Sequence, residues 1–350
     1  MSGFCRHFGV CGGCSHQDLP DADYRALKRR IVADALARHG VDAVVEDVVE
    51  VPPGTRRRAT LKAKKTGRVM VGFHAARSHD IVDVEECPVL VPALERLLPG
   101  LRPLFGELLA EGEGAEFHVT DTDTGIDLSL RWRRPNDPAT LASLARWAVR
   151  LRLARISAHG DVVVELVKPS VRFGKATVLL PPEPFLQPTR EGEAALQAFV
   201  LETLAGARRV ADLFAGCGTF ALPLAAQAQV QAVDLEGAML EALAAAGRST
   251  PGLKPVTVAR RNLFKRPLTG PELALDGVCL DPPRAGALAQ AGALAASKVC
   301  RIAYVSCDAE TFARDARVII GGGYRLDRVV PIDQFLWSSH IEVMGAFERT

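Results

Sequence analysis

The chain has 350 residues, of which 48% are apolar, so it is long enough for two domains that each bury a core. Its 43 Lys and Arg residues nearly balance 41 Asp and Glu residues, and the net charge of +2 excludes attraction of a polyanion by total charge alone. No apolar run reaches the roughly 18 residues of a membrane span, and the N-terminus, MSGFCRHFG, lacks a secretion signal pattern. We therefore expect a cytoplasmic protein without a membrane partner.

Three cysteines near the N-terminus, in the stretch CRHFGVCGGC, are spaced as C-x5-C-x2-C. They are Cys5, Cys11 and Cys14, and a fourth candidate, Cys87, is followed directly by a proline. A reducing compartment disfavours disulfide bonds among them. Zinc sites usually use two close pairs of ligands, whereas iron–sulfur clusters often take three nearby cysteines and one remote one. The pattern favours a [4Fe–4S] cluster, with zinc as the first alternative and unligated thiols as the second.

The first half of the chain mixes helical and strand-like patterns. A charged helix is predicted over residues 21–39 and an amphipathic helix over about 138–153. Strand-like runs include AVVEDVVEV, VMVGF, AEFHVTD, IDLSLRW, VVVELV and ATVLL. We expect an α+β domain over residues 1–180.

Within this half, the stretch TRRRATLKAKKTGR carries seven cations and no acid. A run of this kind forms either a solvated face or a phosphate-binding surface, and the latter would suit RNA. The cations are Arg56, Arg57, Arg58, Lys62, Lys64, Lys65 and Arg68.

The second half, residues 181–350, alternates strands and helices, which predicts a parallel, doubly wound Rossmann-like sheet with ligands at the carboxyl ends of its strands. Polar side chains fall at those ends. Asp212 precedes a glycine turn, and Asp234, Asp281 and Cys307 close later strands. The stretch GCGTFA formally matches a dinucleotide fingerprint, so a nicotinamide or flavin enzyme stays possible. The acidic residue before the turn and the later LDPPRAG loop favour S-adenosylmethionine instead.

With these motifs, the chain resembles the RNA 5-methyluridine methyltransferase family, whose members methylate carbon 5 of uridine in ribosomal and transfer RNA. The resemblance runs nearly end to end. It includes CRHFGVCGGCSHQ, GFHAARSHDIVDVEECPVL, FLQPT, DLFAGCGTFALPLA, LDPPRAG, YVSCDAETFARDA and SSHIEVMGAFER. The oligonucleotide-binding barrel of some members is expected to be absent, because the cysteine motif begins at residue 5.

The resemblance implies site residues for each part of the reaction. It implies that Cys307 is the nucleophile and Glu342 the base. It also implies an iron–sulfur cluster with four cysteine ligands, which are Cys5, Cys11, Cys14 and Cys87. The cofactor contacts it implies are Gln187, Phe214, Thr219, Asp234, Asn262 and Asp281.

Methylation of carbon 5 of uracil requires a thiolate and a base, the same residue types that the resemblance implies. Carbon 5 of uracil becomes nucleophilic when a thiolate adds to carbon 6, and a base must then remove the carbon-5 proton. Cys307 precedes a predicted helix, and a helix N-terminus favours a thiolate. Asp308 would raise the pKa of that thiol unless its carboxylate faces away. His340, predicted on the same strand face as Glu342, is a second base candidate, and the target uridine must be flipped out of its stack.

These inferences predict a monomeric S-adenosylmethionine-dependent RNA uridine-5-methyltransferase, with 23S ribosomal RNA favoured as target and transfer RNA possible. One alternative is a methyltransferase acting on an exocyclic amine through the DPPR loop, which would leave Cys307 without a role. Another is a redox-sensing RNA-binding protein in which the cluster is the functional element. An assay of methyl transfer from labelled cofactor to RNA distinguishes the RNA-binding protein, which would show none, from the two methyltransferases.

Overall fold

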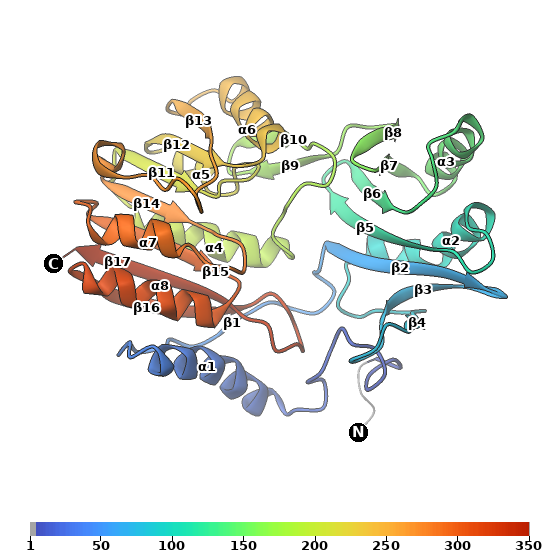
Figure 1. The fold of residues 1–350 in the computed structure, drawn as a ribbon, viewed down its shortest axis with the longest axis horizontal. Coiled ribbons are helices and arrows are strands. Elements are labelled where there is room, and N and C mark those ends of the chain that lie inside the picture. The colour runs from blue at the N-terminus through green and yellow to red at the C-terminus, as the bar shows by residue number, and fades with distance from the viewer. Residues whose placement is uncertain (1–4, 350) are drawn as a thin grey trace.

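The computed structural model describes residues 5–349, which form a seven-stranded sheet, an eight-stranded sheet and a two-stranded ribbon (Figure 1). The seven-stranded N-terminal sheet has the order β4-β3-β2-β5-β6-β7-β8. Only β6 and β7 pair in parallel within it. Its strands are β2 (Arg58–Thr66), β3 (Arg68–His74), β4 (Ile81–Asp83), β5 (Gly114–Thr122), β6 (Gly125–Arg131), β7 (Leu153–Ala158) and β8 (Asp161–Glu165).

Two helices, α2 (Pro92–Leu108) and α3 (Pro138–Arg150), pack against the N-terminal sheet and close its core. The predicted helix over 138–153 is α3, which begins where the Asp137 side chain accepts a hydrogen bond from the Thr140 backbone N–H. The α2 helix is absent from the sequence prediction. The two-stranded ribbon of β9 (Ser170–Phe173) and β10 (Ala176–Leu179) follows this part of the chain.

The C-terminal sheet has eight strands in the order β1-β16-β17-β15-β14-β11-β12-β13. The strands from β15 to β13 are mutually parallel, and β17 runs antiparallel between β15 and β16. The doubly wound sheet expected from the sequence is therefore present, with an antiparallel strand near one edge. Its strands are β1 (Val49–Glu50), β11 (Arg209–Leu213), β12 (Gln229–Asp234), β13 (Val256–Arg260), β14 (Gly277–Leu280), β15 (Arg301–Ser306), β16 (Tyr324–Asp333) and β17 (Glu342–Arg349).

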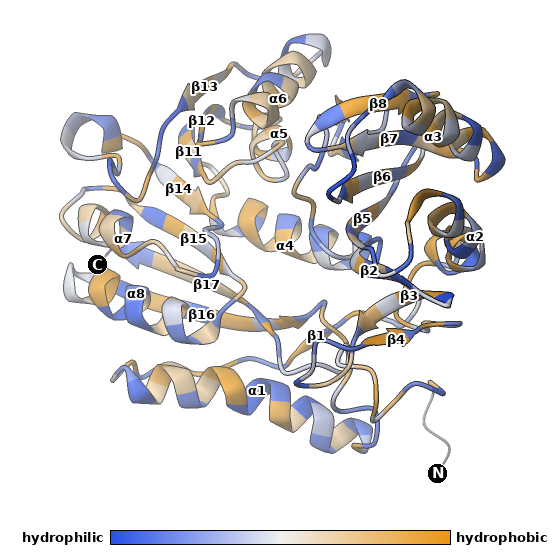
Figure 2. Cartoon of the chain, turned by 45° about the vertical axis from the view of Figure 1, so that its right-hand side comes forward, coloured by the Kyte–Doolittle hydropathy of each residue, from blue (hydrophilic) through white to orange (hydrophobic). Residues whose placement is uncertain are grey.

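Helices cover both faces of the C-terminal sheet, and each face buries its own apolar cluster. One cluster joins α4 (Arg190–Thr203), α5 (Ala221–Leu224) and α6 (Gly237–Ser249) to the sheet. The other joins α1 (Asp21–Arg38), α7 (Leu288–Ala295) and α8 (Ala309–Gly321) to the opposite face. Hydrophilic and hydrophobic residues are interspersed along α1 in Figure 2, and its buried residues are Tyr24, Lys28, Val32, Ala35 and Leu36.

An early segment of the chain joins the late sheet. The α1 helix contacts α8 and β16, and β1 pairs in parallel with β16 through Val49 and Ile332. The run AVVEDVVEV, predicted as a strand, forms only β1 and a single bridge between Val45 and Val329. Val49 and its partner Ile332 are 283 positions apart in the sequence, so local patterning gave no sign of this pairing.

The strand order reverses between β11 and β14, which are neighbours although β12 and β13 separate them in sequence. In doubly wound sheets this switch point is where ligands bind, beyond the carboxyl ends of the strands. Among the described helices, none is both long and apolar enough to cross a lipid bilayer.

Candidate active site

The loop that follows β11 has the geometry of a ligand-binding turn. Phe214 adopts a left-handed backbone conformation with φ of 64°, and the glycines after it, Gly216 and Gly218, have φ of 52° and 99°. A Cβ at Gly218 would approach the side chains of Leu222 and Leu243 within 3.0 Å, so the turn depends on glycine there. Thr219 follows and is buried, two residues before α5 begins.

Asp234, the last residue of β12, ties this turn to the next strand. Its Oδ2 accepts a hydrogen bond from the Gly216 backbone N–H at 2.8 Å, and its Oδ1 accepts one from the Glu236 N–H at 2.9 Å. The carboxylate is thereby fixed at the carboxyl end of the strand, where a ribose diol binds in folds of this kind.

Asn262 and Phe264 follow the end of β13, and Phe214 follows the end of β11. The Asn262 Oδ1 accepts hydrogen bonds from the backbone N–H groups of Phe264 and Lys265, which fixes a tight turn after β13. This turn brings the Phe264 ring to 5.5 Å from that of Phe214. The two rings offer an apolar site for a flat heterocycle such as adenine.

A chain of amides holds Asp281 at the end of β14. The Gln187 Nε2 donates to the Asp281 Oδ2 at 2.8 Å, and the Gln334 Nε2 donates to the Gln187 Oε1 at 2.9 Å. Burial raises the pKa of Asp281 to about 7, against the Gln187 hydrogen bond and the positive charge of Arg58, which lower it. The sequence did not single out Gln334, although it is a polar residue within the largely apolar run PIDQFLW.

A cavity of about 720 Å³ opens between the two sheets and brings the proposed nucleophile and base together. Cys307 and Glu342 both line it, with Arg284, His340 and Phe335. Its other walls come from the cysteine-rich segment, from β2 and from the region around Cys87. The cavity therefore joins residues from both halves of the chain.

Cys307 lies between β15 and α8. Asp308 is the N-cap of α8, and its side chain accepts a hydrogen bond from the Thr311 backbone N–H at 3.0 Å. Burial raises the pKa of the Cys307 thiol to about 12, and the nearby carboxyls of Glu342 and Asp281 raise it further than Asp308 does. Asp308 thus raises the pKa of the thiol less than Glu342 and Asp281 do, although it is the next residue in the chain.

Glu342 is the first residue of β17 and is almost completely buried. Burial raises the pKa of its carboxyl to about 8, and the Asp281 carboxylate adds to the shift. Its Oε2 has no hydrogen-bond partner among the described residues. A buried carboxyl with one unpartnered oxygen and a pKa near neutrality suits a general base.

His340 lies beside this pair but not on a strand, which corrects the sequence prediction. It belongs to the loop between β16 and β17, and β17 begins two residues later. Arg284 donates from Nη2 to the His340 Nδ1 at 2.6 Å. Burial, followed by the charge of Arg284, lowers the pKa of His340. Because a guanidinium can only donate, Nδ1 is the acceptor in this contact, and the lowered pKa favours the neutral imidazole.

The four cysteines predicted to hold a cluster all line the same cavity as Cys307. Burial raises the pKa of Cys87 to about 12, and Cys14 and Cys5 raise it further, so these thiols are neighbours. The Cys11 Sγ accepts a hydrogen bond from the Gly13 N–H at 3.4 Å. Within residues 5–349, however, no three His, Cys, Asp or Glu side chains converge closely enough to hold a metal ion. The donor set fits a thiolate-bound group, but the structure does not show an assembled centre.

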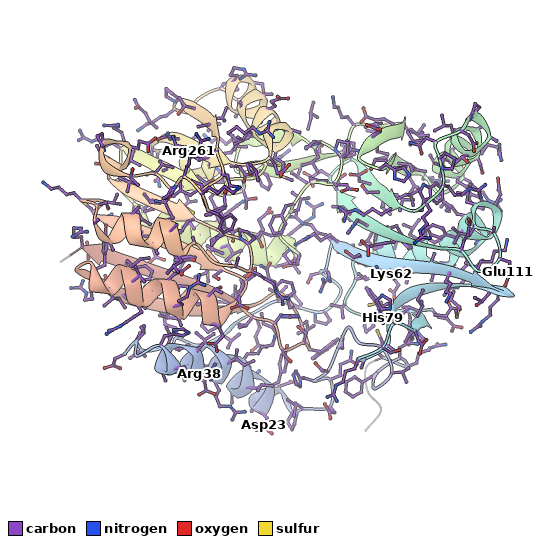
Figure 3. All side chains as sticks on the ribbon, in the orientation of Figure 1. Asp23, Arg38, Lys62, His79, Glu111 and Arg261 are labelled. Atoms are coloured by element: carbon purple, nitrogen blue, oxygen red, sulfur yellow. The ribbon has the colours of Figure 1, made fainter. Side chains whose placement is uncertain are left out.

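The basic stretch separates into two kinds of cation. Arg57 forms a buried ion pair with Glu193, and Lys62, labelled on β2 in Figure 3, pairs with Glu116. Lys65 donates to backbone carbonyls at the end of α2. Arg56 and Arg58 instead line the cavity. The stretch is thus not a single free phosphate-binding surface.

Comparison with solved structures identifies the class of fold. The chain is similar to the tRNA (uracil-54, C5)-methyltransferase of Pyrococcus abyssi, solved in complex with S-adenosyl-L-homocysteine, with a TM-score of 0.76 and 23% identity. The match covers 97% of this chain and 86% of that chain. The fold is that of a Rossmann-like methyltransferase.

Comparison of sequences narrows the class to a family. Residues 259–349 match the model of the tRNA (Uracil-5-)-methyltransferase family. An uncharacterized RNA methyltransferase of Brucella suis biovar 1 is 45% identical over 99% of this chain and 84% of its own length. One from Rhizobium meliloti is 42% identical over 99% of this chain and 85% of its own length. The chain therefore belongs to the RNA (uracil-5-)methyltransferase family.

Proposed function

We propose that this methyltransferase adds a methyl group to carbon 5 of a uridine in RNA through a covalent bond between Cys307 and carbon 6. The observation that carries the proposal is the shared cavity: Cys307 and Glu342 line it together, at the carboxyl ends of the central strands and beside Asp281. A nucleophile and a buried carboxyl facing one cavity are what the chemistry of carbon 5 requires.

The side chains divide the reaction between them. The Cys307 thiolate adds to carbon 6, and the electron pair of the carbon 5–carbon 6 double bond moves into the ring as an enolate, which makes carbon 5 nucleophilic. S-adenosylmethionine, when bound, supplies an electrophilic methyl group. Once carbon 5 is methylated, the Glu342 carboxylate removes its proton, the double bond re-forms, and the carbon–sulfur bond breaks to release the thiolate.

We propose that the cofactor lies over the switch point between β11 and β14. The residues proposed to hold it are Gln187, Phe214, Thr219, Asp234, Asn262 and Asp281. Their placement supports this: the turn after β11 is built from glycines, the Asp234 carboxylate is fixed beside it, and the Phe214 and Phe264 rings lie 5.5 Å apart.

We further propose that Cys5, Cys11, Cys14 and Cys87 hold a [4Fe–4S] cluster with a structural role, with zinc as the alternative metal. The support is that four thiols face one cavity and that no step of the reaction transfers an electron. In this proposal residues 1–180 hold the cluster and contact RNA, and residues 181–350 hold the methyl donor. The protein would act as a cytoplasmic monomer.

The proposed target is 23S ribosomal RNA, with transfer RNA as the alternative. The solved relative from Pyrococcus abyssi is named for uracil 54 of transfer RNA, so both RNA classes belong in the test. The experiment is to map 5-methyluridine in ribosomal and transfer RNA from cells with and without the gene. Loss of one 5-methyluridine supports the proposal. Loss of an exocyclic N-methyl group instead, with every 5-methyluridine retained, overturns it.

A further inference from the structure

A buried ion pair connects α1 to the end of β16. The Lys28 Nζ lies 2.7 Å from the Asp333 Oδ1, and both side chains are at most 1% exposed. The Tyr24 hydroxyl donates to the other carboxylate oxygen, Oδ2, at 2.5 Å. Neither the cofactor turn nor the proposed chemistry uses these three residues, so their burial together needs another explanation.

The Lys28 ammonium also reaches both ends of the next loop. It donates to the Phe335 carbonyl at 3.3 Å and to the His340 carbonyl at 2.5 Å. With Asp333, these bonds use all three donors of the ammonium. We call residues 334–341, between β16 and β17, the β16–β17 loop. Lys28 therefore ties the beginning of this loop to its end.

The middle of the β16–β17 loop is held in a strained conformation. Trp337 is not glycine, yet it has φ of 57°, in the left-handed region. Its backbone N–H donates to the Tyr24 hydroxyl at 2.6 Å, and its carbonyl accepts from the backbone N–H groups of Ser15 and His16 at 2.7 and 3.1 Å. Strain of this kind persists only where the surroundings fix it, and it commonly marks a functional site.

The same loop forms one wall of the catalytic cavity. Phe335, His340 and the serines between them line it, and the loop leads directly into Glu342. Arg284, which lines the cavity, donates to the His340 ring, and Lys28, which does not line it, donates to the His340 carbonyl. A displacement of the loop would therefore move the wall of the cavity and the base together.

We propose that Lys28, with Tyr24 and Asp333, is a positioning residue that holds the β16–β17 loop in the conformation that receives the target base. The inference rests on the proposed uridine methylation, since it assigns this cavity to the RNA base. Stability alone does not explain the ion pair, because buried ion pairs are often replaceable by apolar residues at no cost. No apolar side chain, however, could hold two backbone carbonyls at once.

The test is the double variant Lys28→Met with Asp333→Asn, which removes both charges and leaves neither buried alone. Its matched control is Asp127→Asn with Arg155→Met in the N-terminal sheet. Arg155 is equally buried, pairs with Asp127, and donates to the carbonyls of Leu180 and Pro181, and none of these residues lines the cavity. Arg155 also lies 3.6 Å from the partly exposed Glu165 carboxylate, a contact that Lys28 has no counterpart for. Apart from that contact, each variant loses a buried ion pair and two hydrogen bonds to backbone carbonyls.

The expected result is a rise of about tenfold or more in the KM for RNA in the Lys28 variant, with S-adenosylhomocysteine affinity within about twofold of the parent. Chymotrypsin should also cleave the native Lys28 variant after Phe335, Leu336 or Trp337, and should leave the Arg155 control intact there. Equal RNA KM values and equal resistance of the loop in the two variants would overturn the proposal.

Tyr24→Phe provides a second route if the double variant does not fold. It removes the acceptor for the Trp337 N–H and the donor to Asp333 but leaves the ion pair. We expect loop cleavage and the KM for RNA to increase in this variant too, but by less than in the double variant. If chymotrypsin cleaves the loop no faster than in the parent, the proposal is contradicted. The cleavage comparison needs no methylation, so it remains decisive even if the parent enzyme fails to form 5-methyluridine.

Discussion

At the scale of single residues, the site has an excess of buried acidic groups. The pKa values of Cys307, Glu342 and Asp281 are raised to about 12, 8 and 7, in each case first by burial and, for the first two, next by a neighbouring carboxyl. At neutral pH the thiol is therefore protonated, and the Glu342 carboxyl is largely so. A positive charge brought into the site would lower all three pKa values, and a sulfonium carries such a charge.

The raised pKa of Cys307 predicts slow alkylation by iodoacetamide, because only the thiolate reacts. At about pH 8 we expect Cys307 to react far more slowly than the exposed Cys300, and its rate should keep rising beyond about pH 10. At about pH 9, where most Glu342 is ionised, Glu342→Gln removes a negative charge and should speed the reaction. Peptide-resolved mass spectrometry measures both cysteines in one sample. Equal rates for the two cysteines at about pH 8 would contradict the assigned environment.

At the scale of elements, β2 carries cations with different tasks. Lys65 donates to the carbonyls of Gly106 and Leu109 at 2.8 and 3.0 Å, which satisfies the C-terminal end of α2. Arg58 lines the cavity instead, with its guanidinium 4.5 Å from the Phe185 ring and its Nε without a partner among the described residues. One cation supports the fold, and the other faces the proposed RNA site.

Removing each charge separately should therefore have different effects. Lys65→Met should lower the free energy of unfolding by about 0.5–1 kcal/mol through loss of the helix-end bonds, and leave RNA affinity unchanged. Arg58→Met should weaken RNA binding and reduce its salt dependence. Denaturant unfolding and RNA titrations at several salt concentrations measure the two effects. If Lys65→Met weakens RNA binding as much as Arg58→Met, the stretch acts as one phosphate-binding surface after all.

The elements that sequence reasoning found are those with a local signal. Alternating strands and helices after residue 180 predicted the parallel sheet, and the position of Asp234 and Cys307 at strand ends followed from that pattern. The α2 helix was missed because Pro99 and Pro103 lie inside it, where proline removes a backbone donor and normally ends a helix. Its leucines nevertheless bury one face against the N-terminal sheet.

Contacts between distant segments had no such signal. Gln187 and Gln334 are 147 positions apart, and Lys28 and Asp333 are 305 apart, so neither pair follows from spacing or periodicity. The environment that sets the pKa of Glu342 arises in the same way, from Asp281, Arg58 and Arg284 on other elements. The sequence could identify which residue types the chemistry needs, but not which side chains surround them.

At the scale of the whole molecule, the cysteine-rich segment connects the two sheets. The Gly12 N–H donates to the His74 carbonyl at the end of β3, and the N–H groups of Ser15 and His16 donate to the Trp337 carbonyl in the β16–β17 loop. A group bound by the four cysteines would therefore fix the N-terminal sheet relative to the β16–β17 loop. This is the structural role proposed for the cluster.

The anaerobically purified protein should accordingly be brown, with about four iron atoms and four sulfides per chain. Cys87→Ala should lose most of the colour and the iron, because it removes the ligand in the loop between β4 and α2. Cys300→Ala, at an exposed position outside the cavity, should keep both. Metal analysis and visible absorbance measure this. Colourless protein that contains one zinc per chain would establish the alternative metal.

The most direct test of the proposed mechanism compares Cys307→Ala with Glu342→Gln on the same RNA. The thiolate acts before methyl transfer and the base after it, so the two variants should fail at different steps. Glu342→Gln should accumulate a methylated protein–RNA adduct that survives denaturing electrophoresis and disappears with ribonuclease, whereas Cys307→Ala should give neither adduct nor methylated RNA. Methylation by Cys307→Ala, or normal turnover by Glu342→Gln without any adduct, would contradict the covalent mechanism with these two residues in these roles.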